Sequence, residues 1–238
     1  MTKRGRLSIA ARAYIAAVSL ATVSACAFVW PTKGVPISLG SFFLIVSLGV
    51  LAHAYPIEGP RHQAYQVTLP FIVLAAALFT TGELVAFIVL IHIAEQARLR
   101  RRLYIQWFNV CNYLFSAVTA GVTYHHFAVV LPQGALGQIA AVLAAGCTFI
   151  LLNRLLLAGV LWLARGLSPA ASGLFQQELL GADLVIAWMA GPMLVLTLVA
   201  GPWMILVTAG PLVLARPALA TLLAKYDTPV PQVRERAA

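Results

Sequence analysis

Residues 67–93 read VTLPFIVLAAALFTTGELVAFIVLIHI, an apolar run that the polar residues 80–83 interrupt at its centre. One long tilted helix would bury Glu83 in hydrocarbon, at a cost of several kcal/mol unless the carboxylate is paired. Two shorter helices, at about 64–79 and 83–96, would place Glu83 at the membrane surface, and the glycine before it favours a turn there. We therefore expect two helices, with one long helix as the alternative.

The composition around this run is that of a membrane protein. Of 238 residues, 61% are hydrophobic and 10% are charged, and the mean hydropathy is +0.91. Soluble domains average about 25% charged residues, so this chain lacks the polar material to cover a water-facing surface. Runs of roughly 20 apolar residues, long enough to cross about 30 Å of hydrocarbon, recur along the chain. The sequence predicts an all-α fold, a polytopic transmembrane helical bundle.

We expect about eight membrane helices, or about seven if residues 64–96 form a single helix. In chain order the expected helices are 8–30, 34–55, 64–79, 83–96, one that starts near Asn109, one from Leu136 to Arg165, 180–199 and 203–221. Together they form one membrane domain, residues 1–226, and a short cytoplasmic tail follows at 227–238. Prolines and a glycine predict a loop at 55–63. Three Gly-Pro pairs predict a link at 201–202 and kinks at 191–192 and 210–211.

Basic residues between and around the apolar runs predict the orientation in the membrane. Four of them follow residue 96, namely Arg98, Arg100, Arg101 and Arg102, and others lie at residues 3–6 and 225–236. By the positive-inside rule, both termini and the arginine cluster should lie in the cytoplasm, with Tyr104 and Trp107 at the interface beside this anchor. An even number of helices satisfies this rule, and an odd number places the cluster and the N-terminus on opposite faces.

Several function classes are disfavoured by the same residues. The formal net charge is +9, but its placement beside apolar runs indicates anionic lipid as the partner, and no nucleic acid. The three cysteines lie inside apolar runs without a CxxC pair, which is typical of small buried residues. No HExxH, Walker or GxSxG motif occurs. We expect no enzymatic activity and no cofactor.

A polar stripe follows the arginine cluster. Its members recur at spacings of 3, 4, 3, 4 and 3, namely Asn109, Asn112, Ser116, Thr119, Thr123 and His126. Such spacing holds them on one helical face, which should point into the protein and away from lipid. The stripe either packs helices together or lines a cavity for a polar or amphipathic ligand. The candidate ligand-binding residues are Asn109, Asn112, Ser116, Thr119, Tyr124, Asn153 and Arg154.

Two further groups of polar residues need a separate explanation. Arg154 lies about 27 Å from the outer end of its helix, so it can either extend to the cytoplasmic interface or pair with Asp183. His92 and Glu95 have the three-residue spacing of helical metal sites, but no second such element accompanies them in the sequence. The adjacent residues His125 and His126 point about 100° apart on a helix. We therefore expect no metal site.

The sequence also resembles a known class of membrane module. The resemblance rests on Trp107-Phe108-Asn109, Tyr124, Leu152-Asn153 and the Gly-Pro-rich final helices. Over most of residues 35–222 the chain is similar to the multi-helix N-terminal sensor modules, called MASE-type, of bacterial HD-GYP and GGDEF cyclic-di-GMP signalling proteins. The resemblance implies a multi-pass protein of the bacterial inner membrane. No HD pair or GGDEF-like run follows the helices, so we expect an input module without an output domain.

The leading hypothesis is a sensor-like module that binds an unidentified ligand or lipid in its polar interior. The first alternative is the substrate-binding membrane subunit of a small-solute transporter, with an energising partner that docks on the cytoplasmic arginines. The second is an assembly subunit of a membrane complex, which predicts a protein partner and no ligand.

Overall fold

The computed structural model describes residues 7–30, 37–54, 57–58, 64–65 and 67–210. Its helices are α1 (Ile9–Val29), α2 (Leu39–Ala54), α3 (Leu69–Leu78), α4 (Thr81–Leu99), α5 (Leu103–Val130), α6 (Ala135–Arg165), α7 (Gln177–Trp188) and α8 (Ala190–Ala200). Two short strands, β1 (Ile57–Glu58) and β2 (Ala64–Tyr65), pair antiparallel. β1 lies in the segment expected to be a loop, and β2 lies at the start of the segment expected to be the 64–79 helix. Residues 204–210 are also helical. The predicted all-α class is confirmed.

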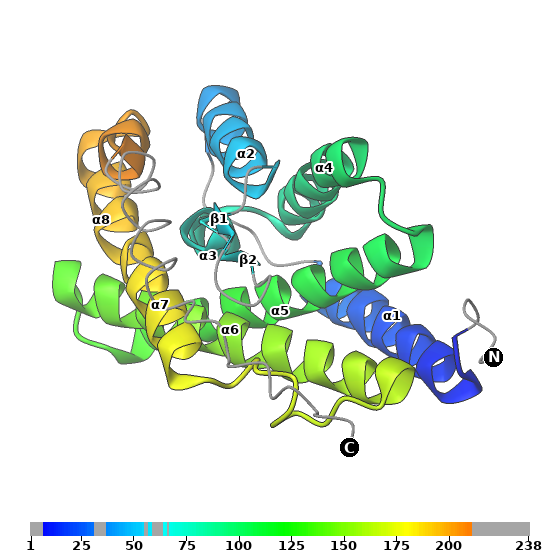
Figure 1. Ribbon diagram of the computed structural model, residues 1–238. Coiled ribbons are helices and arrows are strands. Elements are labelled where there is room, and N and C mark those ends of the chain that lie inside the picture. The colour runs from blue at the N-terminus through cyan, green and yellow to red at the C-terminus, as the bar shows by residue number, and fades with distance from the viewer. Residues whose placement is uncertain (1–6, 31–36, 55–56, 59–63, 66, 211–238) are drawn as a thin grey trace, which may run out of the picture.

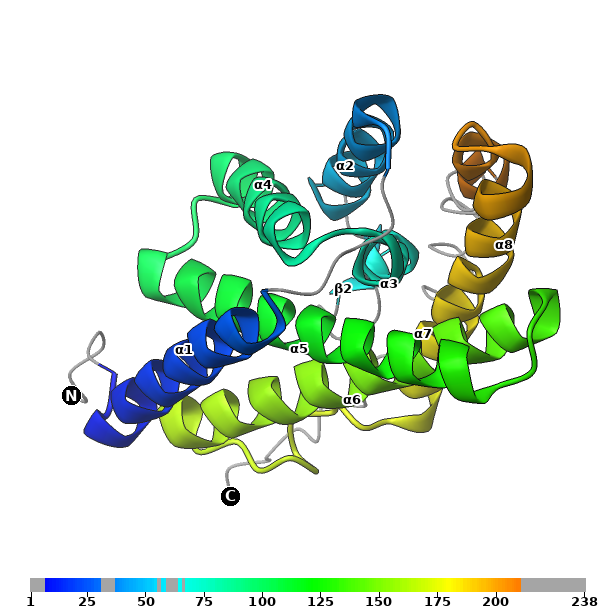
Figure 2. The same cartoon turned by 180° about the vertical axis from the view of Figure 1, so that it is seen from behind.

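The helices pack around α3. α5 and α6 run side by side as a helical hairpin, and α1 crosses both of them (Figure 1). α2 packs on α4, while α7 and α8 rise from the other end of α6, and the view from behind shows the same arrangement (Figure 2). α3 lies in the middle and contacts α2, α4, α5, α6, α7 and α8.

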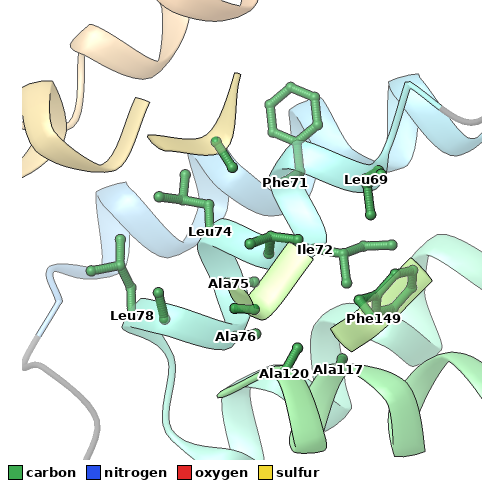
Figure 3. Close-up of a cluster of buried hydrophobic side chains, with 14 of the residues drawn as sticks. Leu69, Phe71, Ile72, Leu74, Ala75, Ala76, Leu78, Ala117, Ala120 and Phe149 are labelled. Carbon is green, nitrogen blue, oxygen red and sulfur yellow. The ribbon is translucent and has the colours of Figure 1, made fainter. Parts of the chain in front are cut away.

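α3 is apolar on every side and has no exposed face. All ten of its residues are buried. In Figure 3, Ile72 and Ala76 lie on the side of Phe149, Ala117 and Ala120 of the α5–α6 hairpin, while Phe71 and Leu74 point to the opposite side. A helix that is hydrophobic all round belongs in the core. At 1.5 Å per residue its ten residues cover about 15 Å, half of the roughly 30 Å of hydrocarbon. The helix at residues 64–79 is therefore shorter than expected, because it begins at Leu69 with Pro70 in its first turn and ends at Leu78, before the next helix begins at Thr81.

The interruption at residues 80–83 does separate two helices, as expected. Thr80 caps α4: its hydroxyl accepts from the Glu83 backbone N–H at 3.3 Å, and the Glu83 carboxylate accepts from the Thr80 N–H at 2.8 Å. This capping box satisfies backbone donors that a helix start leaves unpaired. The turn lies at Phe79-Thr80, just before the Thr81-Gly82 position that we expected.

Three helical segments of the described chain are long and apolar enough to cross a membrane, at Ile9–Val29, Ala135–Arg165 and Gln177–Ala200. α2 and α3 are apolar but shorter. Along the three long segments, large apolar side chains such as Phe28, Leu151 and Val199 are exposed, and all five tryptophans are at least half exposed. So many exposed apolar side chains are typical of a membrane protein.

The Gly-Pro pairs behave as expected where the structure describes them. The helical segment 177–200 is interrupted at Met189, just before Gly191-Pro192, and α8 ends at Ala200, just before Gly201-Pro202. The kink expected at Gly210-Pro211, the rest of the 203–221 helix, the 227–238 tail and the basic residues at both ends lie outside the described residues.

A substitution at Gly121 tests whether α3 and α5 approach as closely as the structure shows. A Cβ at this position would lie 2.8 Å from the Ala76 carbonyl oxygen, which is backbone and cannot rotate away. We expect Gly121→Ala to destabilise the protein by about 1–3 kcal/mol through overpacking. Gly181→Ala is the matched control, since nothing lies within 4 Å of its Cβ position. That change should be neutral or stabilise α7 by up to about 1 kcal/mol. Thermal unfolding in detergent measures both, and equal midpoints would contradict the close approach.

Candidate functional site

The N-terminal ends of α1 and α5 meet the C-terminal end of α6. The Ser8 hydroxyl donates to the Leu163 carbonyl at 2.9 Å, and the Tyr14 hydroxyl donates to the Leu156 carbonyl at 3.2 Å. Beside these contacts lies a cavity of about 250 Å³, which we call the α1–α5–α6 cavity. It is lined by Leu7, Ile15, Arg102, Tyr104, Ile105, Phe108, Asn109, Leu157, Val160, Leu161, Ala164 and Arg165.

The lining of this cavity is amphipathic. Its apolar residues come from all three helices, while the polar lining residues Arg102, Tyr104 and Arg165 belong to helix ends. Asn109 lies farther along α5, almost two turns from the start of that helix. Two guanidinium groups beside an apolar wall suit an amphiphile with a negatively charged head.

The four clustered arginines have different surroundings. Arg98 donates to the Ala54 carbonyl at the end of α2, and Arg101 forms an ion pair with Glu95 at 3.1 Å. Arg100 ends α4 in the left-handed conformation, with φ 47°. Arg102 lines the α1–α5–α6 cavity. The sequence predicted that the four arginines form one anchor. In the structure each of them has a different environment.

The polar stripe on α5 does not line a single cavity. Asn112 is buried and donates through Nδ2 to Asn153 Oδ1 at 2.7 Å, which joins α5 to α6. The hydroxyls of Thr119 and Thr123 donate to carbonyls of their own helix, at 2.9 and 3.0 Å. Ser116 is fully buried, and its hydroxyl has no hydrogen-bond partner among the described residues. Within the stripe, packing therefore accounts for Asn112, Thr119 and Thr123.

The remaining stripe positions separate toward the two ends of α5. Asn109 lines the α1–α5–α6 cavity, and exposed His126 lines a second cavity of about 340 Å³ near Thr81 and Val29. Tyr124, another candidate, donates to Gln138 Oε1 at 2.6 Å and so links α5 to α6. Of the predicted ligand-binding residues, only Asn109 borders the α1–α5–α6 cavity.

Arg154 and Asp183 form an ion pair, which is one of the two alternatives that the sequence left open. The Arg154 Nη2 and Nε atoms lie 2.5 and 3.0 Å from Asp183 Oδ2, and the guanidinium also donates to the Leu174 carbonyl. The exposed fractions of the side chains are 10% for Arg154 and 21% for Asp183. The alternative of an arginine that extends to the interface is therefore wrong. Because these donors are engaged within the protein, Arg154 holds α6 to α7.

The structure brings His53, His92 and Glu95 together in a buried cluster that the sequence did not predict. One ligand atom from each side chain lies within 4.8 Å of the others, and all three side chains are buried. We expected no second element beside His92 and Glu95, and this is wrong, because the C-terminal turn of α2 places His53 there. The three-residue spacing on α4 was the available signal. No local pattern in the sequence indicated that α2 packs on α4.

Comparison with known proteins does not identify a family for this chain. No protein-family model, curated protein or solved structure matches the chain.

The Arg154–Asp183 pair yields a test of stability. Arg154→Met should destabilise the protein by about 3–5 kcal/mol, because it leaves the Asp183 carboxylate buried without its partner. Adding Asp183→Leu should recover much of that loss, since two apolar side chains replace two charges. Arg165→Met, at the exposed end of α6, is the control and should change stability by less than about 0.5 kcal/mol. Unfolding midpoints in detergent that show no recovery in the double variant would contradict the pairing.

Proposed function

We propose that this protein is a non-catalytic, sensor-like membrane module that binds an anionic phospholipid in the α1–α5–α6 cavity. In this proposal it is a multi-pass protein of the bacterial inner membrane, with both termini and the arginine cluster in the cytoplasm. The proposal also takes the protein to be related to the MASE-type input modules that its sequence resembles.

The composition of the cavity lining carries the proposal. Arg102 and Arg165 contribute two positive charges to the lining of an otherwise largely apolar cavity of about 250 Å³. Basic residues near a membrane surface attract anionic lipid by about 1 kcal/mol each. An acyl chain would contact side chains such as Phe108 and Leu157, and the amide of Asn109 would face the region between head and chain.

A signal could leave the cavity through the α5–α6 interface. Asn109 lies three residues before Asn112 on the same face of α5, and Asn112 donates to both the side chain and the carbonyl of Asn153. A ligand that displaces α5 at Asn109 would therefore change the length or angle of this inter-helix hydrogen bond. Such a shift in helix packing is the response we propose for a sensor-like module.

Replacement of the two cavity arginines tests the proposal. The double variant Arg102→Gln with Arg165→Gln should bind phosphatidylglycerol about 30-fold more weakly, from about 1 kcal/mol per lost charge. Native mass spectrometry of the detergent-solubilised protein measures the retained lipid, with phosphatidylcholine as the uncharged reference. Arg100→Gln is the matched control, because this exposed arginine is not among the residues that line the cavity.

Three results would contradict the proposal. Equal loss of lipid in the Arg100 control would indicate general surface attraction, and equal retention of phosphatidylcholine would indicate no selection for charge. A water-soluble small molecule that co-purifies in place of lipid would favour the substrate-binding subunit of a transporter.

A further inference from the structure

We propose that His53, His92 and Glu95 bind one divalent transition-metal ion, with zinc as the best-fitting member of that class. The site lies between α2 and α4 and contributes nothing to the lining of the α1–α5–α6 cavity. It is therefore independent of the lipid-binding proposal.

Both imidazoles present the same nitrogen to the cluster. The Nδ1 of His92 lies 2.8 Å from the Ile88 carbonyl, and because a carbonyl only accepts, Nδ1 carries the proton. The Nε2 of neutral His92 is then a lone pair, and it is buried with no hydrogen-bond partner among the described residues. In His53, Nδ1 lies 3.3 Å from the Thr68 hydroxyl, which can donate or accept, and Nε2 faces Glu95 Oε2 at 3.5 Å.

Such an arrangement prepares a histidine for a metal. Histidine ligands usually donate their other ring N–H to a carbonyl or similar acceptor, which sets the tautomer and the ring orientation. Leaving the His92 lone pair buried and unpaired costs free energy, and a cation bound by both Nε2 atoms would remove that cost. The Tyr113 ring further orients both imidazoles, with ring centroids at 4.8 Å from His92 and 5.6 Å from His53.

Glu95 completes the set and is held on two sides. Its Oε2 lies 3.5 Å from His53 Nε2 and accepts from Gln106 Nε2 at 3.2 Å, while Arg101 pairs with Oε1 at 3.1 Å. Gln106 also donates to the His92 carbonyl at 2.7 Å, so one amide supports both α4 ligands. The Arg101 side chain is 39% exposed, which brings solvent near the Glu95 end of the cluster and screens its charge from a bound cation.

The donor set selects the class of ion. Two imidazoles and one carboxylate suit zinc and iron(II), and the cluster has no thiolate of the kind that selects copper(I). In a tetrahedral zinc site, ligands at about 2.0–2.2 Å from the metal lie about 3.4 Å from one another. The ligand atoms now lie up to 4.8 Å from one another. Rotation of the three side chains would bring them closer together when the ion binds.

Zinc uptake by the full-length protein tests the site. The detergent-solubilised protein is stripped with a chelator, incubated with Zn²⁺, desalted, and its metal content measured by mass spectrometry. We expect one zinc per chain, with at least tenfold weaker binding in His92→Ala. In Gln106→Ala, which keeps all three ligands, binding should weaken by about 10–100-fold. The double variant His125→Ala with His126→Ala is the control for exposed histidines, and it should bind as the original protein does.

A spectroscopic measurement keeps the test valid if a variant fails to fold. Co²⁺ added to the unaltered protein should give visible absorption bands of nitrogen and oxygen coordination, and Zn²⁺ should displace them. The proposal is overturned if the unaltered protein takes up no more zinc than His92→Ala, or if Co²⁺ gives only the spectrum of the hydrated ion. It is also overturned if the His125 and His126 control loses the metal.

Discussion

The fold depends on the complete burial of α3. Ten apolar residues with no polar face cannot meet water, and at about 15 Å the helix is too short to cross the hydrocarbon by itself. Other helices must therefore surround it, and α2, α4, α5, α6, α7 and α8 all do so. Small residues make this possible where backbones approach closely, as Gly121 does against the Ala76 carbonyl. These helices therefore pack around α3, in which every residue is buried.

Polar groups inside this apolar frame are mostly paired between helices. Arg154 with Asp183 joins α6 to α7, Asn112 with Asn153 joins α5 to α6, and the Tyr124 hydroxyl joins α5 to α6 through Gln138. In a low-dielectric interior an unpaired polar atom is expensive, so each of these pairs restricts how the helices can pack. Among the described residues, the buried His92 Nε2 and Ser116 hydroxyl depart from that rule, and the His92 nitrogen belongs to a cluster of possible metal ligands.

The candidate sites were only partly predictable from the sequence. The Arg154–Asp183 pair was one of two alternatives that the sequence left open, and only the structure shows the contact, because the pairing depends on how α6 and α7 pack. The six-residue stripe on α5 was correctly identified as inward-facing near its middle, but its members serve different contacts, and only Asn109 reaches the α1–α5–α6 cavity. His53 was missed because it lies 39 residues before His92, and a periodic pattern carries information only within one helix.

The sequence by itself determined the membrane class, the all-α fold and the break that separates α3 from α4. These follow from local properties, namely apolar content, charge placement and a threonine–glutamate capping pair, each of which acts within a few residues. Only the tertiary structure decided that α3 is a short core helix, that α2 brings His53 to His92 and Glu95, and that Arg102 and Arg165 share one cavity. Those facts depend on which helices pack together, and helix packing arises from contacts between residues far apart in the chain.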